Sequence, residues 1–389
     1  MITGTNFPGA TAASFENVAT TGWGRPAVGV PDPPMLGSGV SREPERRITV
    51  LEPRPSGHRK LVRRAVAACA ALALAAFMVG MSAVPAYAAT CSGGATMTID
   101  VAGGESIALS LSGGADPLGI VVTPSDPSCG GFDTSTVTAI HVNGTDGDEN
   151  VTIDQSGSAP FPHQNTTAID LALGAGADAL VIAGQSTADS IGFGSDGISL
   201  DAGGTPDVTG IATVEGFTVD AGAGDDTVSG REGGGLGGVF ATALTIHGEV
   251  GNDALTGGDA DDEISGESED DTLKGGAGGD MIDGGSGGDV VSGGDASDEV
   301  MGGAGSDQLK GGDGGDTLDG GAEADTLRGG EGPDTVNGGD GNDGLRGGGG
   351  DDDVNGDSGR DELAGGHGND HCLGGPDPDS ITGCESGHP

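Results

Sequence analysis

GGAGGDMID (Gly275–Asp283) and GGAGSDQLK (Gly302–Lys310) are two copies of a nine-residue unit that recurs along the carboxyl-terminal part of this chain. The unit runs over residues 248–382 without insertion or deletion, which makes 15 copies in 135 residues. Position one is Gly and position six is Asp in all 15 copies, and position eight is Leu, Ile or Val in 14, with Cys372 as the exception. Low-complexity sequence predicts neither a constant register nor a constant Asp, so the repeat indicates a solenoid.

The pattern G-G-x-G-x-D-x-U-x resembles the hemolysin-type calcium-binding repeats, the RTX nonapeptides. The resemblance covers about a third of the 389 residues and is specific because the copies are consecutive. It implies an all-β, right-handed parallel β-roll in which the x-U-x triplet forms a short strand, the Gly-rich six residues form a turn, and two units make one coil. It also implies that calcium ions lie in the turns, held by Asp carboxylates and main-chain carbonyls of stacked coils.

The chemistry of the residues leads independently to calcium. A unit with one aliphatic residue in nine can bury only a thin core, which is insufficient to offset the entropy of ordering the chain. Stacking also brings equivalent carboxylates to about 4.8 Å from one another, where each pair repels by about 1 kcal/mol even in water. Calcium accepts six to eight oxygen ligands in flexible geometry, and Gly allows the backbone to present its carbonyls. We therefore expect calcium to drive folding of the repeats.

The predicted metal ligands are the position-six aspartates, which fall into two columns because alternate copies lie on the same side of the roll. One column contains Asp253, Asp271, Asp289, Asp307, Asp325, Asp343, Asp361 and Asp379, and the other contains Asp262, Asp280, Asp298, Asp316, Asp334, Asp352 and Asp370. Eight turns enclose seven gaps and seven turns enclose six, so the columns predict at most about 13 calcium ions.

Some copies depart from the pattern where the turn needs Gly, which puts their turn geometry in doubt. The departures are Glu249, Glu267 and Asp357 at position two, and Ala260, Glu269, Ala296, Glu323 and Asp377 at position four. The last copy also carries Pro376 and Pro378, which predict a cap at the end of the roll.

The composition excludes several classes of protein. With 83 Gly, 3% aromatic residues and a net charge of −46, the chain has too few basic residues to neutralise nucleic-acid phosphates. Gly does not recur at every third position, which excludes collagen. Low hydrophobicity with high charge is typical of disorder, and only the regular repeat outweighs that interpretation.

The amino-terminal segment predicts export. Residues 58–88 combine a basic cluster, an uncharged stretch and the small-x-small triplet Ala86-Tyr87-Ala88, which together are typical of a signal peptide cleaved after Ala88. An uncleaved membrane anchor is the alternative. Residues 1–57 are an extension interpreted either as a disordered tail or as a start codon placed too early. The mature chain would carry 6 basic and 56 acidic residues, and we expect it to be secreted without membrane insertion.

Residues 89–247 precede the repeats and contain strand-like alternation at residues 96–101 and 107–111, with turn-strand echoes of the repeat further on. The longer spacing of these echoes predicts larger, less regular β-helical coils. Residues 383–389 form a short tail. The mature chain has four cysteines, and Cys91 with Cys129 and Cys372 with Cys384 are the natural local pairings among three possible connectivities.

No catalytic constellation emerges from the sequence. The His-Glu-x-x-His motif is absent, and the G-x-S-x-G match at residues 284–288 falls in repeat register, where Gly already recurs. A secreted β-helix enzyme acting on polysaccharide is the main alternative for residues 89–247. That segment has Arg231 as its only Lys or Arg and lacks Tyr and Trp, which disfavours a sugar-binding active site.

The sequence thus predicts a secreted calcium-binding repeat protein that is structural or adhesive at the cell surface and is not an enzyme. Its expected partners are calcium ions, with cell-surface or matrix components left open and nucleic acid excluded.

Overall fold

A computed structural model describes residues 90–93, 96–101, 105–112, 119–123, 139–156, 168–200, 206–231 and 236–385. The chain divides into two units, Met1–Met81 and Ser82–Pro389, and every described residue lies in the second. The predicted extension and signal peptide (residues 1–88), Cys129 and residues 386–389 lie outside the described residues, and so the predictions for these parts stay predictions.

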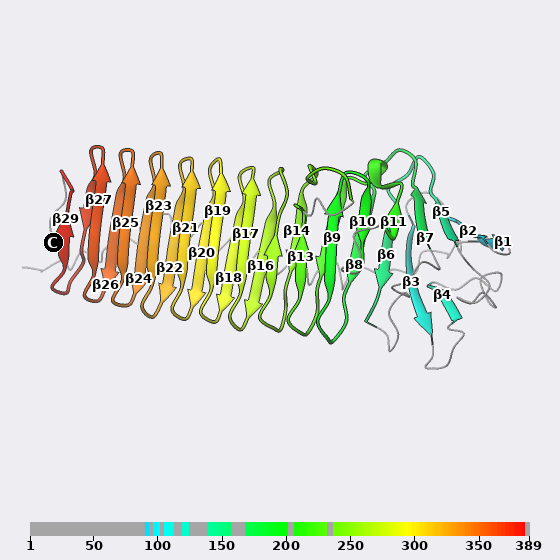
Figure 1. Cartoon of the computed structure of the whole chain (residues 1–389), viewed down its shortest axis with the longest axis horizontal. Helices are drawn as coiled ribbons and strands as arrows, with labels where there is room; N and C mark the ends of the chain where they lie inside the picture. Colours follow the sequence, from blue (N-terminus) through cyan, green and yellow to red (C-terminus); the bar gives the residue numbers. More distant parts are fainter. Residues whose placement is uncertain are drawn as a thin grey trace, which may run out of the picture. The chain divides into compact units, whose positions relative to one another are not determined.

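The repeats form a parallel roll of two sheets (Figure 1). Successive strands alternate between a 16-stranded and a 13-stranded sheet, so each strand pairs with the strand two further along the chain. In this pairing Leu309 lies opposite Leu327, the position-eight residue two units later. The strands are β15 (Ala254–Thr256), β16 (Glu263–Ser268), β17 (Thr272–Ala277), β18 (Met281–Ser286), β19 (Val290–Asp295), β20 (Glu299–Ala304), β21 (Gln308–Asp313), β22 (Thr317–Ala322), β23 (Thr326–Glu331), β24 (Thr335–Asp340), β25 (Gly344–Gly349), β26 (Asp353–Ser358), β27 (Glu362–His367), β28 (His371–Leu373) and β29 (Ser380–Thr382).

Most strands in the roll are longer than the predicted triplet. Each of β16 to β27 has six residues, because it continues through positions one to three of the following unit and leaves positions four to six as the turn. The ladder skips position one, as Asp283 pairs with Met301 and the next pair is Gly285 with Gly303. The Gly-rich six residues are therefore half strand and half turn.

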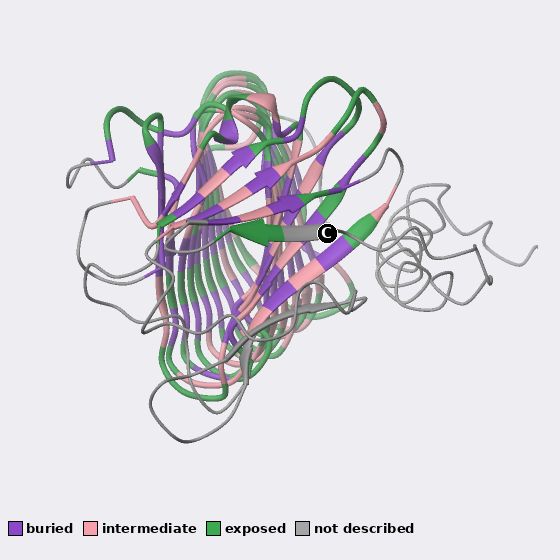
Figure 2. Cartoon of the chain, turned by 90° about the vertical axis from the view of Figure 1, so that its right-hand side faces the viewer, coloured by how far each residue is buried: buried purple, intermediate pink, exposed green. Residues whose placement is uncertain are grey.

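The core of the roll is a single file of aliphatic side chains between the two sheets. Position eight is buried in each unit from Leu255 to Cys372, whereas the residues on either side of it point outward. Figure 2 shows this alternation of buried and more exposed residues along the strands. Period-two burial is what a half-buried strand requires, and it confirms the predicted assignment of position eight.

The described residues between 90 and 247 form larger coils on the same two sheets, as expected. The strands are β1 (Thr90–Gly93), β2 (Thr96–Asp100), β3 (Ser106–Ser112), β4 (Gly119–Thr123), β5 (Ala139–Asn143), β6 (Asn150–Asp154), β7 (Ala168–Ala172), β8 (Ala179–Ala183), β9 (Ser190–Gly194), β10 (Gly197–Ser199), β11 (Val208–Thr209), β12 (Gly216–Asp220), β13 (Thr227–Ser229) and β14 (Leu244–His247). Hydrogen bonds between neighbouring coils join residues 29, 37 and 27 positions apart here, compared with 18 in the roll.

Antiparallel pairs interrupt the parallel order in this part. β1 pairs with β2 and β4 with β3, so the amino-terminal edge of each sheet ends in an antiparallel strand, and β10 is antiparallel to both β9 and β11. Where the large coils meet the roll, the rings of Phe193, Phe217 and Phe240 pack together with centroids 5.0–6.1 Å apart. Among the described residues, no helix is long and apolar enough to cross a membrane.

Candidate metal centre

The position-six aspartates lie inside the turns, although each carries a charged group. The first fourteen, from Asp253 to Asp370, are no more than 3% exposed, and Asp379 at the end of the roll is half-buried. Asp is rarely buried to this extent unless it is paired or binds a metal. The burial follows from the repeat, because position six is followed directly by the strand that carries the core residue.

One carboxylate oxygen of each buried aspartate links neighbouring coils. The main-chain N–H of Asp289 donates to Oδ1 of Asp307, 18 residues later, at 2.8 Å, and Asp307 donates likewise to Asp325. The same bond recurs along both columns at 2.7–3.1 Å. The structure therefore arranges the predicted residues in the two predicted columns, one on each side of the roll.

The second carboxylate oxygen is buried without a hydrogen-bond partner in thirteen of these residues. They are Asp253, Asp271, Asp280, Asp289, Asp298, Asp307, Asp316, Asp325, Asp334, Asp343, Asp352, Asp361 and Asp379. Asp262 differs, since its Oδ2 accepts the N–H of Gly258 at 2.5 Å. A buried oxygen that carries negative charge and accepts no hydrogen bond is costly, so its recurrence points to a bound cation.

Burial and neighbouring carboxylates raise the pKa of many aspartates in the two columns, of which three show the largest shift. Burial is the larger cause, and it raises the pKa of Asp271, Asp280 and Asp325 to about 7. The neighbouring aspartates of the same column raise it further, whereas the main-chain N–H that each carboxylate accepts lowers it. The columns therefore carry negative charge near neutral pH only at a cost that a cation would relieve.

Main-chain carbonyl oxygens of one coil lie close to the backbone of the next coil. A β-carbon at Gly305 would collide with the carbonyl oxygen of Gly287 in the preceding coil, and one at Gly303 would collide with that of Gly285. These oxygens thus point across the gap toward the next coil. A β-carbon at Gly302 would collide with Oδ2 of Asp307 in its own unit, which explains why position one is always Gly.

The donor set fits calcium. It consists of one buried carboxylate oxygen per turn and carbonyl oxygens of the adjoining backbone, and hard cations with flexible geometry prefer oxygen ligands of this kind. Within the described ranges, no three His, Cys, Asp or Glu side chains converge as a metal site by themselves. Main-chain carbonyls would supply further oxygen ligands for a calcium ion. Bound calcium would supply the positive charge that the column lacks.

Six of the eight residues that replace Gly at positions two and four keep the backbone conformation that Gly normally provides, whereas Ala260 and Asp377 do not. Positive φ values of 64–82° are found at Glu249, Glu267, Glu269, Ala296, Glu323 and Asp357. The doubt about turn geometry is thus resolved at these six positions, where the turns are preserved at the cost of left-handed strain. At one of these positions the side chain also forms a hydrogen bond, since Oε2 of Glu323 accepts the N–H of Gly305 at 3.0 Å.

The columns extend beyond the repeats toward the amino terminus. The N–H of Glu149 donates to Asp178, and the N–H of Asp178 donates to Glu215, both at 2.9 Å. On the other side Asp189 donates to Asp226, and Asp226 donates to Asp253, the first repeat aspartate. Because the coil length varies here, a nine-residue period in the sequence does not predict this ladder of hydrogen bonds. A signal is nevertheless present, since Glu149, Asp178 and Asp226 each precede a strand, as the repeat aspartates do.

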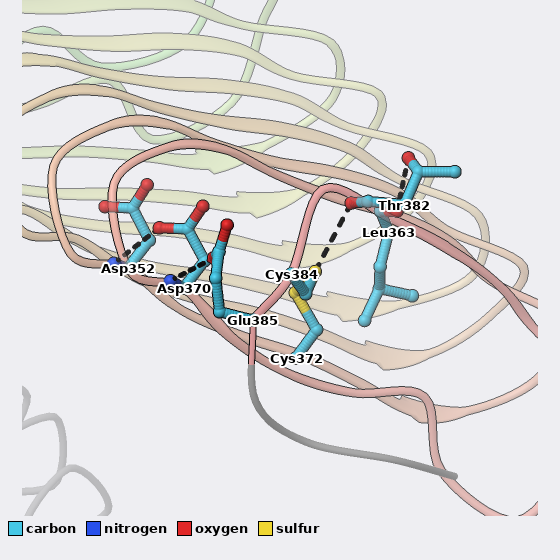
Figure 3. The surroundings of a disulfide bond; sticks show 7 residues. All are labelled: Asp352, Leu363, Asp370, Cys372, Thr382, Cys384 and Glu385. Atoms are coloured by element: carbon cyan, nitrogen blue, oxygen red, sulfur yellow. Dashed lines mark hydrogen bonds between the residues drawn. A yellow bond between two sulfur atoms is a disulfide. The ribbon is translucent and has the colours of Figure 1, made fainter.

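The carboxyl-terminal end of the roll is closed by a cap (Figure 3). Cys372 and Cys384 form a disulfide with 5.9 Å between their α-carbons, which confirms that predicted pairing. Glu385 then takes the place of the next aspartate in its column, because its Oε2 accepts the N–H of Asp370 at 2.8 Å. Glu385 lies outside the nine-residue register, so the sequence did not predict its place in the column.

The comparison with known families agrees with the geometry. The family described as RTX calcium-binding nonapeptide repeat (4 copies) matches residues 218–235 and, in overlapping segments, residues 245–381. No curated protein matches the chain. The first match includes Asp226, so the recognisable repeats begin before the regular register. With the buried aspartates in two columns and a matching family, residues 218–235 and 245–381 of this chain are RTX calcium-binding nonapeptide repeats, and the regular repeats among them form a parallel β-roll.

Proposed function

We propose that this chain is a secreted protein whose roll folds when calcium binds between its turns, and that it is structural or adhesive at the cell surface. The observation that carries the proposal is the set of thirteen buried, unpaired carboxylate oxygens. Without a cation they oppose stacking of the coils, and with calcium they hold neighbouring coils together. Millimolar calcium outside the cell would then allow the roll to fold only after export.

The test is a calcium titration of the full chain, followed by far-UV circular dichroism, with magnesium as the control. We expect a cooperative rise in β signal with calcium and not with magnesium, which is smaller and demands strict octahedral geometry. A roll already folded in chelator would contradict calcium-driven folding. A chain that remains unfolded at millimolar calcium would contradict the proposal as a whole.

Calcium binding also extends, in this proposal, to the carboxylates before the regular repeats. Oε2 of Glu149 and Oδ2 of Asp178 and Asp226 are buried and unpaired like those of the roll. The predicted maximum of about 13 ions for the repeats alone would then be exceeded. Asp178→Asn should lower the number of bound calcium ions. Asp148→Asn is the control, because exposed Asp148 also accepts an N–H from the adjacent coil, that of Ala177, but leaves the column intact.

We propose no catalytic role for residues 89–247. The described part of this segment has one close His–carboxylate pair, in which Nδ1 of His141 lies 3.1 Å from Oδ2 of Asp170. Thr209, on the next strand, donates to Asp170 and not to His141, so no activated hydroxyl results. Incubation with acidic polysaccharides should give no new chain ends. Turnover that is lost in His141→Ala would establish the enzyme alternative.

A further inference from the structure

Four of the few basic side chains form a row on the outer face of the 16-stranded sheet. Lys274, Lys310, Arg328 and Arg346 each occupy position nine of their unit, on β17, β21, β23 and β25 (Figure 1). All four are exposed. Position nine of the 13-stranded sheet carries no Lys or Arg in any unit, so the row belongs to one face of the roll.

The register places three of these cations in direct succession and the fourth one strand further away. Lys310 lies opposite Arg328, and Arg328 lies opposite Arg346, as neighbours in the parallel ladder. Ser292 on β19 separates Lys310 from Lys274. Because parallel strands are about 4.8 Å apart, the row spans about 19 Å from β17 to β25. Like charges directly opposite one another are unfavourable in a sheet, so this arrangement calls for an anion.

Within the described part of the protein, none of the four side chains forms an ion pair. The preceding outward position is uncharged along β17 to β25, where it holds Thr, Val, Gln, Thr and Gly. The nearest acidic residues on these strands are Asp295, Asp313 and Glu331 at position three, which flank the row and would confine a bound anion to its line.

We propose that this row binds a linear acidic polysaccharide that lies across the strands, along the axis of the stack. An extended polymer with a carboxylate on each sugar matches a straight line of cations on a flat sheet, and binding would neutralise charges that now repel one another. The row has no aromatic side chain on which nucleic-acid bases could stack. The inference rests on the proposed calcium-dependent roll and gives its adhesive role a partner class.

The equivalent line of a second copy of this chain, position nine of its 13-stranded sheet, is a less suitable partner. That line carries Asp283 and Asp319, but both are half-buried. Asp283 also accepts the main-chain N–H of Gly285, so its carboxylate is already engaged. Asp319 likewise takes part in interactions of its own. The carboxylates of a soluble polyanion, in contrast, remain accessible to the row of cations.

The experiment measures binding of a short oligogalacturonate to the calcium-saturated full chain by calorimetry, with circular dichroism to confirm folding. We expect salt-sensitive binding that Arg328→Gln weakens by about fivefold and that combined substitution of Lys310, Arg328 and Arg346 by Gln abolishes. Arg360→Gln is the matched control, because exposed Arg360 lies in the turn between β26 and β27 and not in the row. It should leave the affinity unchanged.

Three results would overturn the inference. The first is a folded wild-type roll that does not bind, and the second is an equal loss of affinity in Arg360→Gln and Arg328→Gln. The third is self-association of the wild type, seen by sedimentation without oligogalacturonate and abolished by the triple substitution, which would assign the row to a second copy. A chain that fails to fold in calcium would contradict the proposed function first, and circular dichroism separates that case from the others.

Discussion

At the scale of single residues, each unit of the roll places one charged and one aliphatic side chain inside the protein. Asp307 and Leu309 illustrate the pair, since both are no more than 3% exposed although they lie two positions apart. Burial of the leucine stabilises the fold. The aspartate has one carboxylate oxygen hydrogen-bonded to the preceding coil and one without a hydrogen-bond partner. In the proposed function, the position-six residue is therefore where metal binding and folding would be coupled.

Substitution of one buried aspartate should remove calcium sites. Asp307→Asn keeps the shape of the side chain and its hydrogen bond to Asp289 but removes the charge, so we expect the loss of about one or two bound ions and a higher calcium midpoint of folding. Asp313→Asn removes the same charge from an exposed position in β21 and serves as the control. Equal effects of the two substitutions on ion count would show that overall charge, and not the column, governs binding.

Strain at position four can be tested with two exposed alanines. Ala296 has φ of 82°, whereas Ala304 lies in β20 without positive φ. Ala296→Gly should raise the free energy of unfolding by about 0.5 kcal/mol, because relief of left-handed strain exceeds the entropic cost of Gly. Ala304→Gly should lower it by about the same amount. Chemical denaturation in saturating calcium measures both, and a lower stability of Ala296→Gly would be inconsistent with strain at this turn.

At the scale of elements, the strands near the carboxyl terminus depend on a cap that lies outside the repeat pattern. β28 and β29 are three residues long, and each is the last strand of its sheet. Among the described residues, no further coil follows these strands to accept their hydrogen bonds. The Cys372–Cys384 disulfide and the bond between Glu385 and Asp370 fasten this end.

Removal of the disulfide should loosen this end of the roll. The bridge closes a loop of 12 residues, for which the loss of chain entropy in the unfolded state gives about 3 kcal/mol. We expect Cys372→Ser with Cys384→Ser to accelerate hydrogen exchange of β27 to β29, while β17 to β19 exchange as in the wild type. Uniform acceleration along the roll would mean that the bridge supports the whole stack and is not a local cap.

At the scale of the whole molecule, the two columns of carboxylates make stability depend on pH in opposite ways with and without calcium. Burial raises the pKa of Asp271, Asp280 and Asp325 to about 7 and that of Asp289 and Asp334 to about 6. An unfolded aspartate has a pKa of about 3.9. The folded, metal-free chain therefore binds more protons than the unfolded chain between these values.

Without calcium, acidification should stabilise the roll. A raised pKa contributes stability that is fully present below about pH 3.9 and is lost as the pH rises through about 6 to 7. In chelator we expect more β signal at about pH 5 than at about pH 8, and in calcium we expect a higher calcium midpoint at the lower pH, because protons compete for the same oxygens. High salt at about pH 8 is the control for general charge repulsion. If salt alone restores the β signal as fully as acid does, the buried aspartates are not responsible.

The nine-residue period was sufficient to predict the features that recur in every coil. Constant Gly, Asp and aliphatic positions predict the roll, the two columns and the calcium chemistry, because each property repeats with every coil. The Cys372–Cys384 bridge was also a natural prediction, since those cysteines are only 12 residues apart in the sequence.

The residues outside the register that join the columns could be identified only from the tertiary structure. Glu149, Asp178, Asp226 and Glu385 are brought into line by coils of other lengths and by the cap, and no fixed spacing marks them. The unpaired second oxygen and the row of cations on one face are likewise properties of stacking. They arise because residues 18 apart become neighbours only when the coils are laid on one another.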